Sequence, residues 1–415
     1  MKINKYSFGL GDRFGLQGKA QLTAILKAQS FNIDIIPVWN KSFREHQTIK
    51  SDHQSVRAEA DEAVKLLHWQ HPYFVDADHI NLTNVDGFIN YSDFFTIDVA
   101  DYIGGKSADS NISDFVKFNL PYIGQLTIPG IEIPFAISEE FVWYIGEKFL
   151  AAASEASKIY HHIISKKGKQ NFITEISIDE VEDPHTPQEL FFILSALHFY
   201  EVYPQTIAPK FTGRFNKGVD YVGDLVTFEW EFEQDLLVLE AAIKAFNMPE
   251  NLKLSVHSGS DKFSIYKPIS KLIRKHKKGI HIKTAGTTWL EELAGLALSN
   301  GNGLKMAKTI YKKAFDRFDE LTGPYSSVID IDKECLPYPD LVNTWNAEKF
   351  AGSLRHVPSN PEFNNDFRQL LHVAYKIAAE YGNDFLELVK KNEKFIAPLV
   401  TENIFDNHIK PLFID

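Results

Sequence analysis

Segments with the alternating hydrophobicity of β-strands are separated by helix-like segments along most of the chain, and this rhythm restricts the fold more than any other feature. Residues 33–39 form a nearly continuous apolar run, which is typical of a strand covered on both faces in a parallel sheet. Alternating strands and helices indicate parallel strands joined by helical crossovers. We predict strands at 6–10, 33–39, 73–75, 172–181, 206–211, 252–257 and 279–286.

Eight such units would close into a TIM-type (β/α)8 barrel. We expect the eighth strand at 327–331 or just before the turn that contains His356. The alternative, a doubly wound sheet, usually has a glycine-rich phosphate turn after its first strand. Here Gly9, Gly11 and Gly15 lack the required spacing, and Arg13 would stand where a cofactor phosphate approaches. The sequence therefore favours the barrel.

The stretch 85–135 breaks the rhythm, because it is long for a loop and contains glycine and proline. We interpret it as a helical insertion after the third strand, serving as a lid or an interface. Extra helices are expected near the C-terminus, for example at 367–381. The whole chain, 1–415, is thus predicted to be a single barrel domain with these additions.

Composition excludes several functions. The 415 residues are 44% hydrophobic and carry a net charge of −11 without a basic block, unlike a nucleic-acid binder. No run reaches the ~18 apolar residues of a membrane helix, and the start of the chain does not resemble a secretory signal. The only cysteine, Cys335, cannot form an intramolecular disulfide. We expect a cytoplasmic protein that acts on small molecules, and a homo-oligomer stays open.

The active site of such a barrel lies at the C-terminal ends of its strands. Most predicted strands end in side chains that can bind a metal, titrate or form hydrogen bonds. A buried cluster of this kind is costly unless it is used or a ligand neutralises it. The residues at these ends are Asp12, Arg13, Asn40, Lys41, Asp76, Asp78, Glu180, Lys210, His257 and Lys283.

A divalent metal site is predicted around Glu180 and His257. Carboxylate and imidazole ligands suit Zn, Mn, Ni or Co without selecting strongly among them. A third ligand is needed, for which His356 is the first choice and Asp76 the second. Two interpretations without a metal stay open: Glu180 forms an ion pair with Lys210, or His356 is an ordinary loop residue.

The substrate is expected to be an anion or a polyhydroxylated molecule, because cations accompany the predicted metal ligands. Backbone N–H groups in the turn Ser258-Gly259-Ser260 suit an anion. His46 and His79 are expected to play supporting parts at most. The candidate substrate-binding residues are Arg13, Asn40, Lys41, Lys210, Arg214, Ser258, Ser260 and Asp261.

Several short motifs occur in order along most of the chain. They are Gly11-Asp12-Arg13-Phe14, Asn40-Lys41-Ser42, Arg44-Glu45-His46, Asp76-Ala77-Asp78-His79, Asp220-Tyr221-Val222-Gly223-Asp224, His257-Ser258-Gly259-Ser260-Asp261-Lys262-Phe263, Lys283-Thr284-Ala285-Gly286-Thr287 and His408-Ile409-Lys410-Pro411. This ordered set resembles the tagaturonate epimerase family. The resemblance implies a metal-dependent barrel enzyme of hexuronate catabolism that interconverts D-tagaturonate and D-fructuronate. It also implies relatives that act as tagatose/fructose 4-epimerases.

The chemistry implied by this resemblance inverts a carbon that lies β to a ketone, where the C–H bond is not appreciably acidic. We therefore expect metal-assisted retro-aldol cleavage, rotation of the aldehyde fragment and re-addition. Asp78 would move the hydroxyl proton and Lys283 would assist the oxyanion. Asp76 remains an alternative base. Transient oxidation by a bound nicotinamide is disfavoured, because the dinucleotide fingerprint is missing.

Three other functions stay open. A class II aldolase would use the same metal but release two fragments. A Schiff-base aldolase would use Lys283 or Lys210 as its nucleophile. A non-catalytic sugar-acid binding protein would bind its ligand without turnover.

Overall fold

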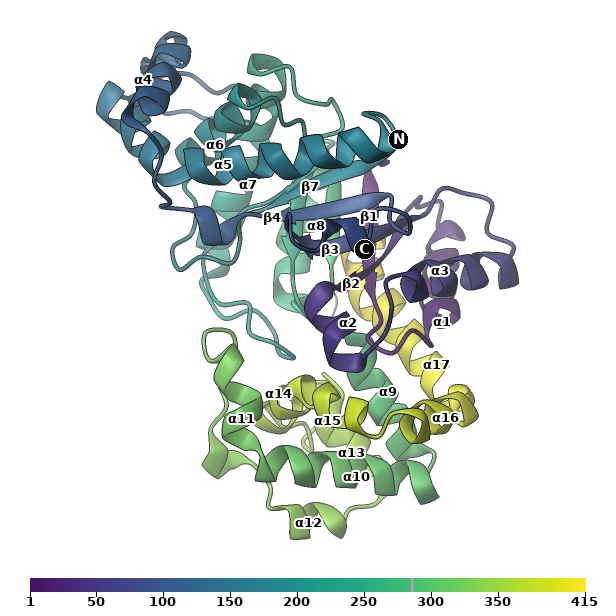
Figure 1. The fold of residues 1–415 in the computed structure, drawn as a ribbon. Helices are drawn as coiled ribbons and strands as arrows, with labels where there is room; N and C mark the ends of the chain where they lie inside the picture. The colour runs from purple at the N-terminus through teal and green to yellow at the C-terminus, as the bar shows by residue number, and fades with distance from the viewer. Residues whose placement is uncertain (285–286) are drawn as a thin grey trace.

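Eight parallel strands form a closed barrel in the computed structural model, which describes residues 1–284 and 287–415 (Figure 1). Their order around the barrel is β1-β10-β9-β8-β7-β4-β3-β2. The predicted TIM-type (β/α)8 barrel is therefore confirmed. The barrel strands are β1 (Tyr6–Gly11), β2 (Ile36–Ser42), β3 (Phe74–Ile80), β4 (Phe94–Asp98), β7 (Ile173–Ser177), β8 (Thr206–Ala208), β9 (Lys253–His257) and β10 (Ile280–Lys283).

Helices cover the outer face of the barrel, because the outward side chains of the strands are apolar. In β9, Leu254 and Val256 are buried in the main hydrophobic core, while Ser255 and His257 alternate with them and face inward. The helices between strands are α1 (Gly18–Gln29), α2 (Phe43–Ile49), α3 (Gln54–Leu66), α5 (Glu139–Lys167), α6 (Pro187–Phe199), α7 (Leu225–Ala245) and α8 (Phe263–Lys275).

Strand β4 lies inside the stretch 85–135, which the sequence pattern had indicated to be an insertion without a barrel strand. Only a 3-10 turn at Val85–Gly87 separates it from β3, so the strand–helix rhythm fails at this point. The rest of the stretch follows the fourth strand rather than the third. It forms helix α4 (Asp109–Phe118) and the hairpin of β5 (Gly124–Leu126) and β6 (Phe135–Ile137).

The barrel closes through β10 and β1, which pair from Tyr6 with Ile280 to Gly9 with Lys283. The prediction of a further strand at 327–331 or before His356 is wrong, because neither place forms one. The last two residues of the strand predicted at 279–286 lie outside the described residues.

Additional helices follow β10, as predicted. Figure 1 shows α10–α16 gathered at one end of the barrel, with α9 and α17 running between this group and the barrel. None of the described helices has the length and apolar character needed to cross a membrane. The elements are α9 (Thr287–Leu298), α10 (Gly301–Asp316), α11 (Phe318–Thr322), α12 (Pro339–Asn343), α13 (Ala347–Leu354), α14 (Asn365–Val373), α15 (Tyr375–Glu380), α16 (Asn383–Lys391), α17 (Glu393–Glu402) and a π-helix at Asn403–Ile414.

The barrel interior is polar at the end where the strands finish. At the other end, a separate hydrophobic cluster containing Ile36, Val38, Phe74, Phe94 and Ile173 fills the side formed by β2, β3, β4 and β7. The opposite side of that end, formed by β1, β9 and β10, holds the buried polar residues Ser7, Lys253 and His281. Two residues further along β2, β3 and β7, the inward positions are Asn40, Asp76 and Glu175. The polar end therefore lies where the strands finish, which is the active-site end of this fold.

Candidate metal and substrate site

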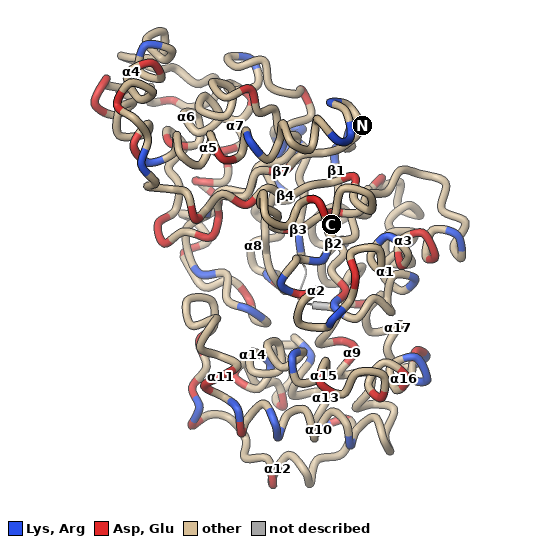
Figure 2. The backbone as a smooth tube through the Cα atoms, viewed as in Figure 1, with Lys and Arg blue, Asp and Glu red and all other residues tan. Residues whose placement is uncertain are grey.

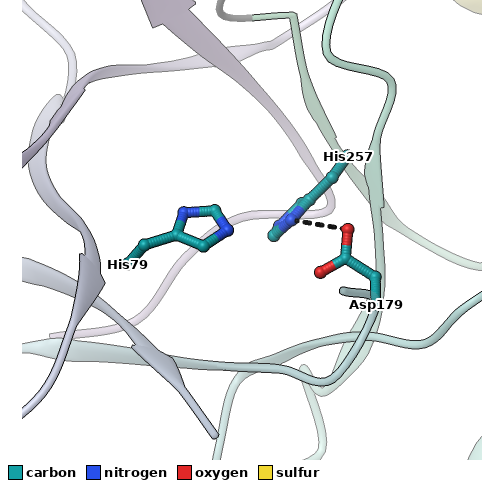
Figure 3. A group of neighbouring side chains, drawn as sticks. All are labelled: His79, Asp179 and His257. Atoms are coloured by element: carbon teal, nitrogen blue, oxygen red, sulfur yellow. Dashed lines mark ion pairs between the residues drawn. The ribbon is translucent and has the colours of Figure 1, made fainter. Parts of the chain in front are cut away.

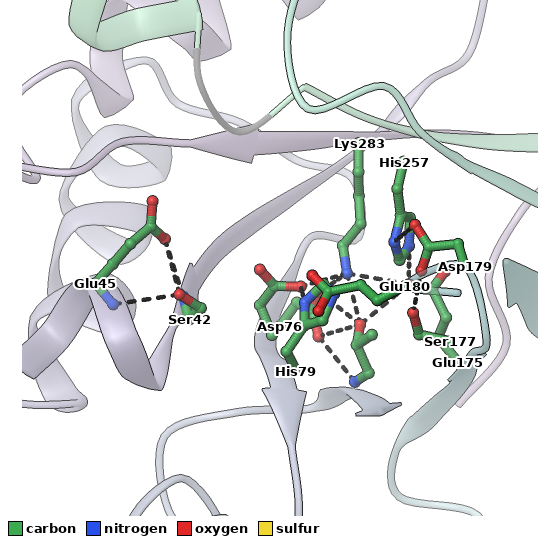
Figure 4. A network of polar contacts seen from close by, with 12 residues as sticks. Ser42, Glu45, Asp76, His79, Glu175, Ser177, Asp179, Glu180, His257 and Lys283 are labelled. Atoms are coloured by element: carbon green, nitrogen blue, oxygen red, sulfur yellow. Dashed lines mark hydrogen bonds and ion pairs between the residues drawn. The ribbon is translucent and has the colours of Figure 1, made fainter. Parts of the chain in front are cut away.

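A buried lysine surrounded by three carboxylates occupies the polar end of the barrel (Figure 4). Lys283 Nζ lies 2.8 Å from Asp76 Oδ2 and 2.7 Å from Asp78 Oδ1. It also lies 3.0 Å from Glu175 Oε1 and donates a 2.6 Å hydrogen bond to Thr96 Oγ1. We call Lys283, Asp76, Asp78 and Glu175 the Lys283 cage.

The cage keeps Lys283 protonated. Burial would lower the pKa of its ammonium group, but the three carboxylates raise that pKa well above its usual value. A lysine must lose its proton before it can attack a carbonyl group. The cage therefore argues against a Schiff base on Lys283 and favours a role as a fixed positive charge.

The carboxylates of the cage differ in their titration. Burial raises the pKa of Asp76 to about 6, although Lys283 acts in the opposite direction. Burial would also raise the pKa of Asp78, but His79 and Lys283 hold it well below its usual value. Burial would raise the pKa of Glu175 as well, but Lys283 and the imidazole of His257 outweigh burial and lower it well below its usual value. The cage thus carries more negative than positive charge at neutral pH.

Next to the cage, His79, Asp179 and His257 form a group that could hold a metal ion (Figure 3). One ligand atom from each residue lies within 4.8 Å of the other two. His257 Nδ1 is 3.3 Å from Asp179 Oδ2, and the two imidazole centroids are 5.6 Å apart. We call these three residues the His79 triad. Of them, the sequence predicted only His257 as a ligand.

Each imidazole of the triad is oriented by a carboxylate of the cage. His257 Nε2 lies 2.8 Å from Glu175 Oε1, and His79 Nδ1 lies 2.8 Å from Asp78 Oδ1. This leaves His257 Nδ1 and His79 Nε2 as the nitrogens available to a metal. A carboxylate behind each ligating imidazole is the usual arrangement in protein metal sites, because it fixes the ring and its tautomer.

Charge also suits a cation at the triad. Burial would lower the pKa of both imidazoles, but Asp78 raises that of His79 to about 10. Asp179 and Glu175 raise that of His257 to about 9. Burial would raise the pKa of Asp179, but the imidazolium of His257 keeps it below its usual value. The raised pKa values favour a proton on each imidazole, and a divalent ion can bind these nitrogens in place of the protons.

A bulge in β3 explains why His79 reaches the site. Neighbouring strand residues normally point to opposite faces, so Asp78 and His79 should diverge. The register between β3 and β4 shifts between Ala77 and Ile80, and His79 has a left-handed φ of 55°. This irregularity brings both side chains to the same site, where they form a hydrogen bond. Period-two reasoning gives no signal for it.

Glu180, which the sequence predicts as a metal ligand, is not one of the three triad residues. Ile176 and Ile178, which precede Glu180 by four and two residues, are buried in the outer core. The inward positions of β7 are instead the odd-numbered ones, so Glu175 was missed. Glu180 lies beyond the strand with 58% of its side chain exposed, and its Oε1 is 4.0 Å from His79 Nε2.

His356, the first choice for a third ligand, is also absent from the triad. Its Nδ1 lies 3.1 Å from Asp261 Oδ2, and its ring stacks on Phe263. Asp261 also pairs with Arg368 at 2.7 Å and with His408 at 3.3 Å. We call Asp261, Arg368, His356 and His408 the Asp261 cluster. It joins the loop after β9 to the C-terminal helices.

The polar side chains of the turn after β9 are also used within the protein. Ser258 Oγ donates a 2.8 Å hydrogen bond to the carbonyl oxygen of Lys283. Ser260 Oγ accepts hydrogen bonds from Gly218 N and from Lys262 Nζ. These contacts, like those of Asp261, favour a structural role over the predicted binding role.

Two of the predicted substrate-binding residues lie at the polar end of the barrel. Asn40 is buried, and neither its Oδ1 nor its Nδ2 has a partner in the described part of the chain. A Cβ added at Gly9 would lie 2.8 Å from Asn40 Nδ2 and 2.9 Å from Lys283 Cγ, so Asn40 adjoins the cage. Arg13 is held by a 3.1 Å ion pair with Glu45.

Lys41, Lys210 and Arg214 are not brought to the triad. Lys41 alternates with the inward Asn40 and is buried on the other face of β2, beside Glu59. Lys210 is half-buried, and its backbone exchanges hydrogen bonds with His185. Arg214 is exposed and forms a 3.1 Å ion pair with Asp330.

The family model UxaE, described as tagaturonate epimerase, matches residues 1–412. A tagaturonate/fructuronate epimerase of Thermotoga maritima is 27% identical over 418 residues, covering 96% of this chain and 79% of that protein. A glycerol complex of the fructuronate-tagaturonate epimerase UxaE from Cohnella laeviribosi aligns with a TM-score of 0.81 at 23% identity. It covers 99% of this chain and 82% of the other. The native crystal structure of the same protein aligns with a TM-score of 0.79 at 22% identity, covering 99% of this chain and 82% of the other.

Proposed function

Because the chain belongs to the tagaturonate epimerase family, we propose that it interconverts D-tagaturonate and D-fructuronate with the help of a divalent metal ion. The proposal places this enzyme in the cytoplasm, acting on a small sugar acid. The Thermotoga maritima relative carries the same activity in its name.

The observation that carries the proposal is the oriented pair of imidazoles in the His79 triad. His79 and His257 each offer one nitrogen beside the Asp179 carboxylate, and a cage carboxylate holds each ring from behind. These residues fit Zn, Mn, Ni or Co, and ligand type alone does not choose among them. Such a metal, when bound, would polarise the substrate's ketone and stabilise negative charge next to it.

The residues of the cage would supply the proton transfer and the fixed charge. In a retro-aldol route, Asp78 accepts the proton of the hydroxyl on the carbon to be inverted. The carbon–carbon bond then breaks, leaving its electron pair on the carbon beside the ketone. Lys283, 2.7 Å from Asp78, stabilises the oxygen that gains negative charge. Rotation of the aldehyde fragment and re-addition return the proton and give the epimer.

Inversion requires a proton-transfer group on each side of the aldehyde. Glu180 is suited to the second side, since its carboxylate is exposed and lies near His79 Nε2. Asp76, with a pKa of about 6, is enclosed by Thr96 and Lys283 and so is less accessible to substrate. We therefore retain Asp78 as the first base and assign Asp76 to holding Lys283 in place.

The test is to measure the metal content of the purified protein together with its activity on D-fructuronate. We expect about one metal per chain, product of unchanged mass, loss of activity with a chelator and recovery with Mn, Ni or Zn. Two smaller products would indicate the class II aldolase, and binding without turnover would indicate a binding protein. Full activity in metal-free protein would overturn the metal-dependent mechanism.

A further inference from the structure

A group of positively charged and neutral polar side chains lies where the barrel meets the C-terminal helices. Arg13 follows β1, and Lys217 belongs to the segment between β8 and α7. His372, Tyr325 and Tyr375 come from the C-terminal part of the chain. Figure 2 shows basic segments at this junction, contributed both by the barrel and by the helices. The mechanism above uses none of these side chains.

Lys217 is a half-buried cation without a carboxylate partner. It forms no ion pair within the described part of the chain, and its Nζ lies 5.5 Å from the centroid of the Tyr325 ring. Burial lowers its pKa, and the nearby Arg13 lowers it further. An unpaired cation in such a position is unfavourable unless an anion accompanies it.

Arg13 is held rigidly beside this lysine. Its Nε pairs with Glu45, and its Nη1 donates a 2.9 Å hydrogen bond to the carbonyl oxygen of His372. Its guanidinium carbon lies 3.9 Å from the centroid of the Tyr375 ring. Among the described residues, Nη2 of Arg13 has no hydrogen-bond acceptor. The N–H groups on that side of the guanidinium therefore remain available to a ligand.

His372 provides an independent sign of a missing ligand. It is only 1% exposed, yet neither ring nitrogen has a hydrogen-bond partner in the described structure. Burial, together with Arg13 and Lys217, lowers its pKa well below the usual value, so the ring is neutral. A Cβ on Gly218 would lie 3.4 Å from His372 Cβ, which places the Lys217–Gly218 backbone against this residue. A neutral imidazole can donate one N–H to an anion.

The group adjoins the His79 triad. The Glu180 carboxylate, 4.0 Å from His79 Nε2, is also near enough to Lys217 to act on the pKa of that lysine. A molecule of sugar size could therefore place one end at the triad and the other at Arg13 and Lys217. Two cations and a neutral donor match a carboxylate better than a hydroxyl group.

We propose that Arg13, Lys217 and His372 bind the carboxylate of the substrate and make the enzyme select a sugar acid over the neutral ketose. This inference rests on the proposed function. It replaces Lys210 and Arg214, which the sequence suggested for this task. The C-terminal helices then supply part of the substrate site rather than only a scaffold.

The test compares the wild type with Lys217→Met and Lys217→Arg on D-fructuronate and on the neutral ketose D-fructose. Losing a charged hydrogen bond to the carboxylate should raise KM for D-fructuronate about 10- to 100-fold. The loss on D-fructose should be several-fold smaller, and Lys217→Arg should recover most of the selectivity. Lys313→Met is the matched control, because Lys313 is also half-buried over a tyrosine ring, 4.4 Å from the Tyr381 centroid, but lies on α10.

Equal losses on both substrates, or no loss on D-fructuronate, would overturn the carboxylate assignment while leaving the epimerase function intact. If the wild type turns over neither sugar, the proposed function fails, and calorimetric binding then decides the site. Tighter binding of D-fructuronate than of D-fructose, lost in Lys217→Met but kept in Lys313→Met, would support the assignment. Equal binding of the two sugars would overturn it.

Discussion

The Lys283 cage and the Asp261 cluster are both buried charge clusters at the same end of the barrel, but their charges are arranged in opposite ways. The cage places three carboxylates around one ammonium group. The Asp261 cluster places an arginine and two histidines around one carboxylate. Burial would raise the pKa of Asp261, but Arg368 and the hydrogen bond from His356 keep it well below its usual value.

The difference separates a binding site from a structural joint. Asp261 and Arg368 are both fully buried and balance each other, so the cluster needs no further ion. The cage has excess negative charge and lies next to the His79 triad, in which His257 Nδ1 and His79 Nε2 are available to a metal. A buried cluster with unbalanced charge is where a ligand should be sought, and a balanced one is where the fold is held together.

The largest expected effect tests the unbalanced side. His257→Gln should lower kcat/KM on D-fructuronate about 1,000-fold, because it removes a ligand of the proposed metal while keeping a polar side chain of similar size. Bound metal should fall in parallel, measured by mass spectrometry of the metals. His408→Gln in the Asp261 cluster is the control and should keep its metal. Full metal content and activity in His257→Gln would show that the triad is not the metal site.

Mutation of the Asp261 cluster, whose charges are balanced, should lower the free energy of unfolding rather than the activity. Asp261→Asn leaves Arg368 as an uncompensated buried charge, which typically costs about 3–5 kcal/mol. Urea denaturation should show this loss, whereas kcat of the folded protein should stay near that of the wild type. If Asp261→Asn kept its stability but lost activity, Asp261 would be a substrate-binding residue, as the sequence predicted, and not part of a structural cluster.

A third prediction concerns Glu292, a buried carboxyl group outside both clusters. Burial and the neighbouring Asp12 raise its pKa well above the usual value. As pH rises past the ordinary range of a glutamate, the unfolded chain loses this proton while the folded protein keeps it, so folding stability falls. Glu292→Gln lacks this titrating group and so avoids the loss. The free energy of unfolding of the variant, relative to that of the wild type, should therefore rise with pH by at most about 1.4 kcal/mol per pH unit.

The measurement for Glu292 is the free energy of unfolding of both proteins at pH 5 and pH 8. Glu387→Gln, which changes a glutamate in an exposed ion pair with Lys390, serves as the control. A difference between wild type and Glu292→Gln that shrinks as pH rises would contradict the buried, protonated state.

The smallest effect is expected for Arg214→Gln. Its ion pair with Asp330 is exposed, with 48% and 71% of the two side chains accessible. Pairs of this kind contribute about 0–1 kcal/mol, so the free energy of unfolding should change little. KM for D-fructuronate should also be nearly unchanged. A large rise in KM would restore the substrate role that the sequence suggested.

The regular features of the fold were accessible from sequence, and the irregular ones were not. The alternation of strands and helices predicted the barrel, and the positions of His257, Asp78 and Lys283 at the ends of predicted strands placed them at its polar end. The same reasoning failed at Glu175, because the apolar face of β7 packs outward under helices and the polar face points inward. It also failed at β4, where no helix precedes the strand.

His79 was out of reach for a different reason. Its position depends on the register shift in β3, which is a property of strand pairing rather than of local composition. The Asp261–His356 contact joins residues 95 positions apart through the packing of the C-terminal helices, so sequence spacing could not reveal it either. Long-range packing, not residue chemistry, set the limit.

The left-handed backbone of His79 has a consequence for how this chain can be improved. A non-glycine residue in that conformation typically costs about 1–3 kcal/mol. Replacing His79 with glycine would relieve this strain but leave the buried Asp78 without its imidazole partner, so the variant should gain no stability and should lose turnover. A search for stabilising changes that scores only backbone strain would select this change and discard the enzyme. Engineering of this scaffold should hold position 79 fixed.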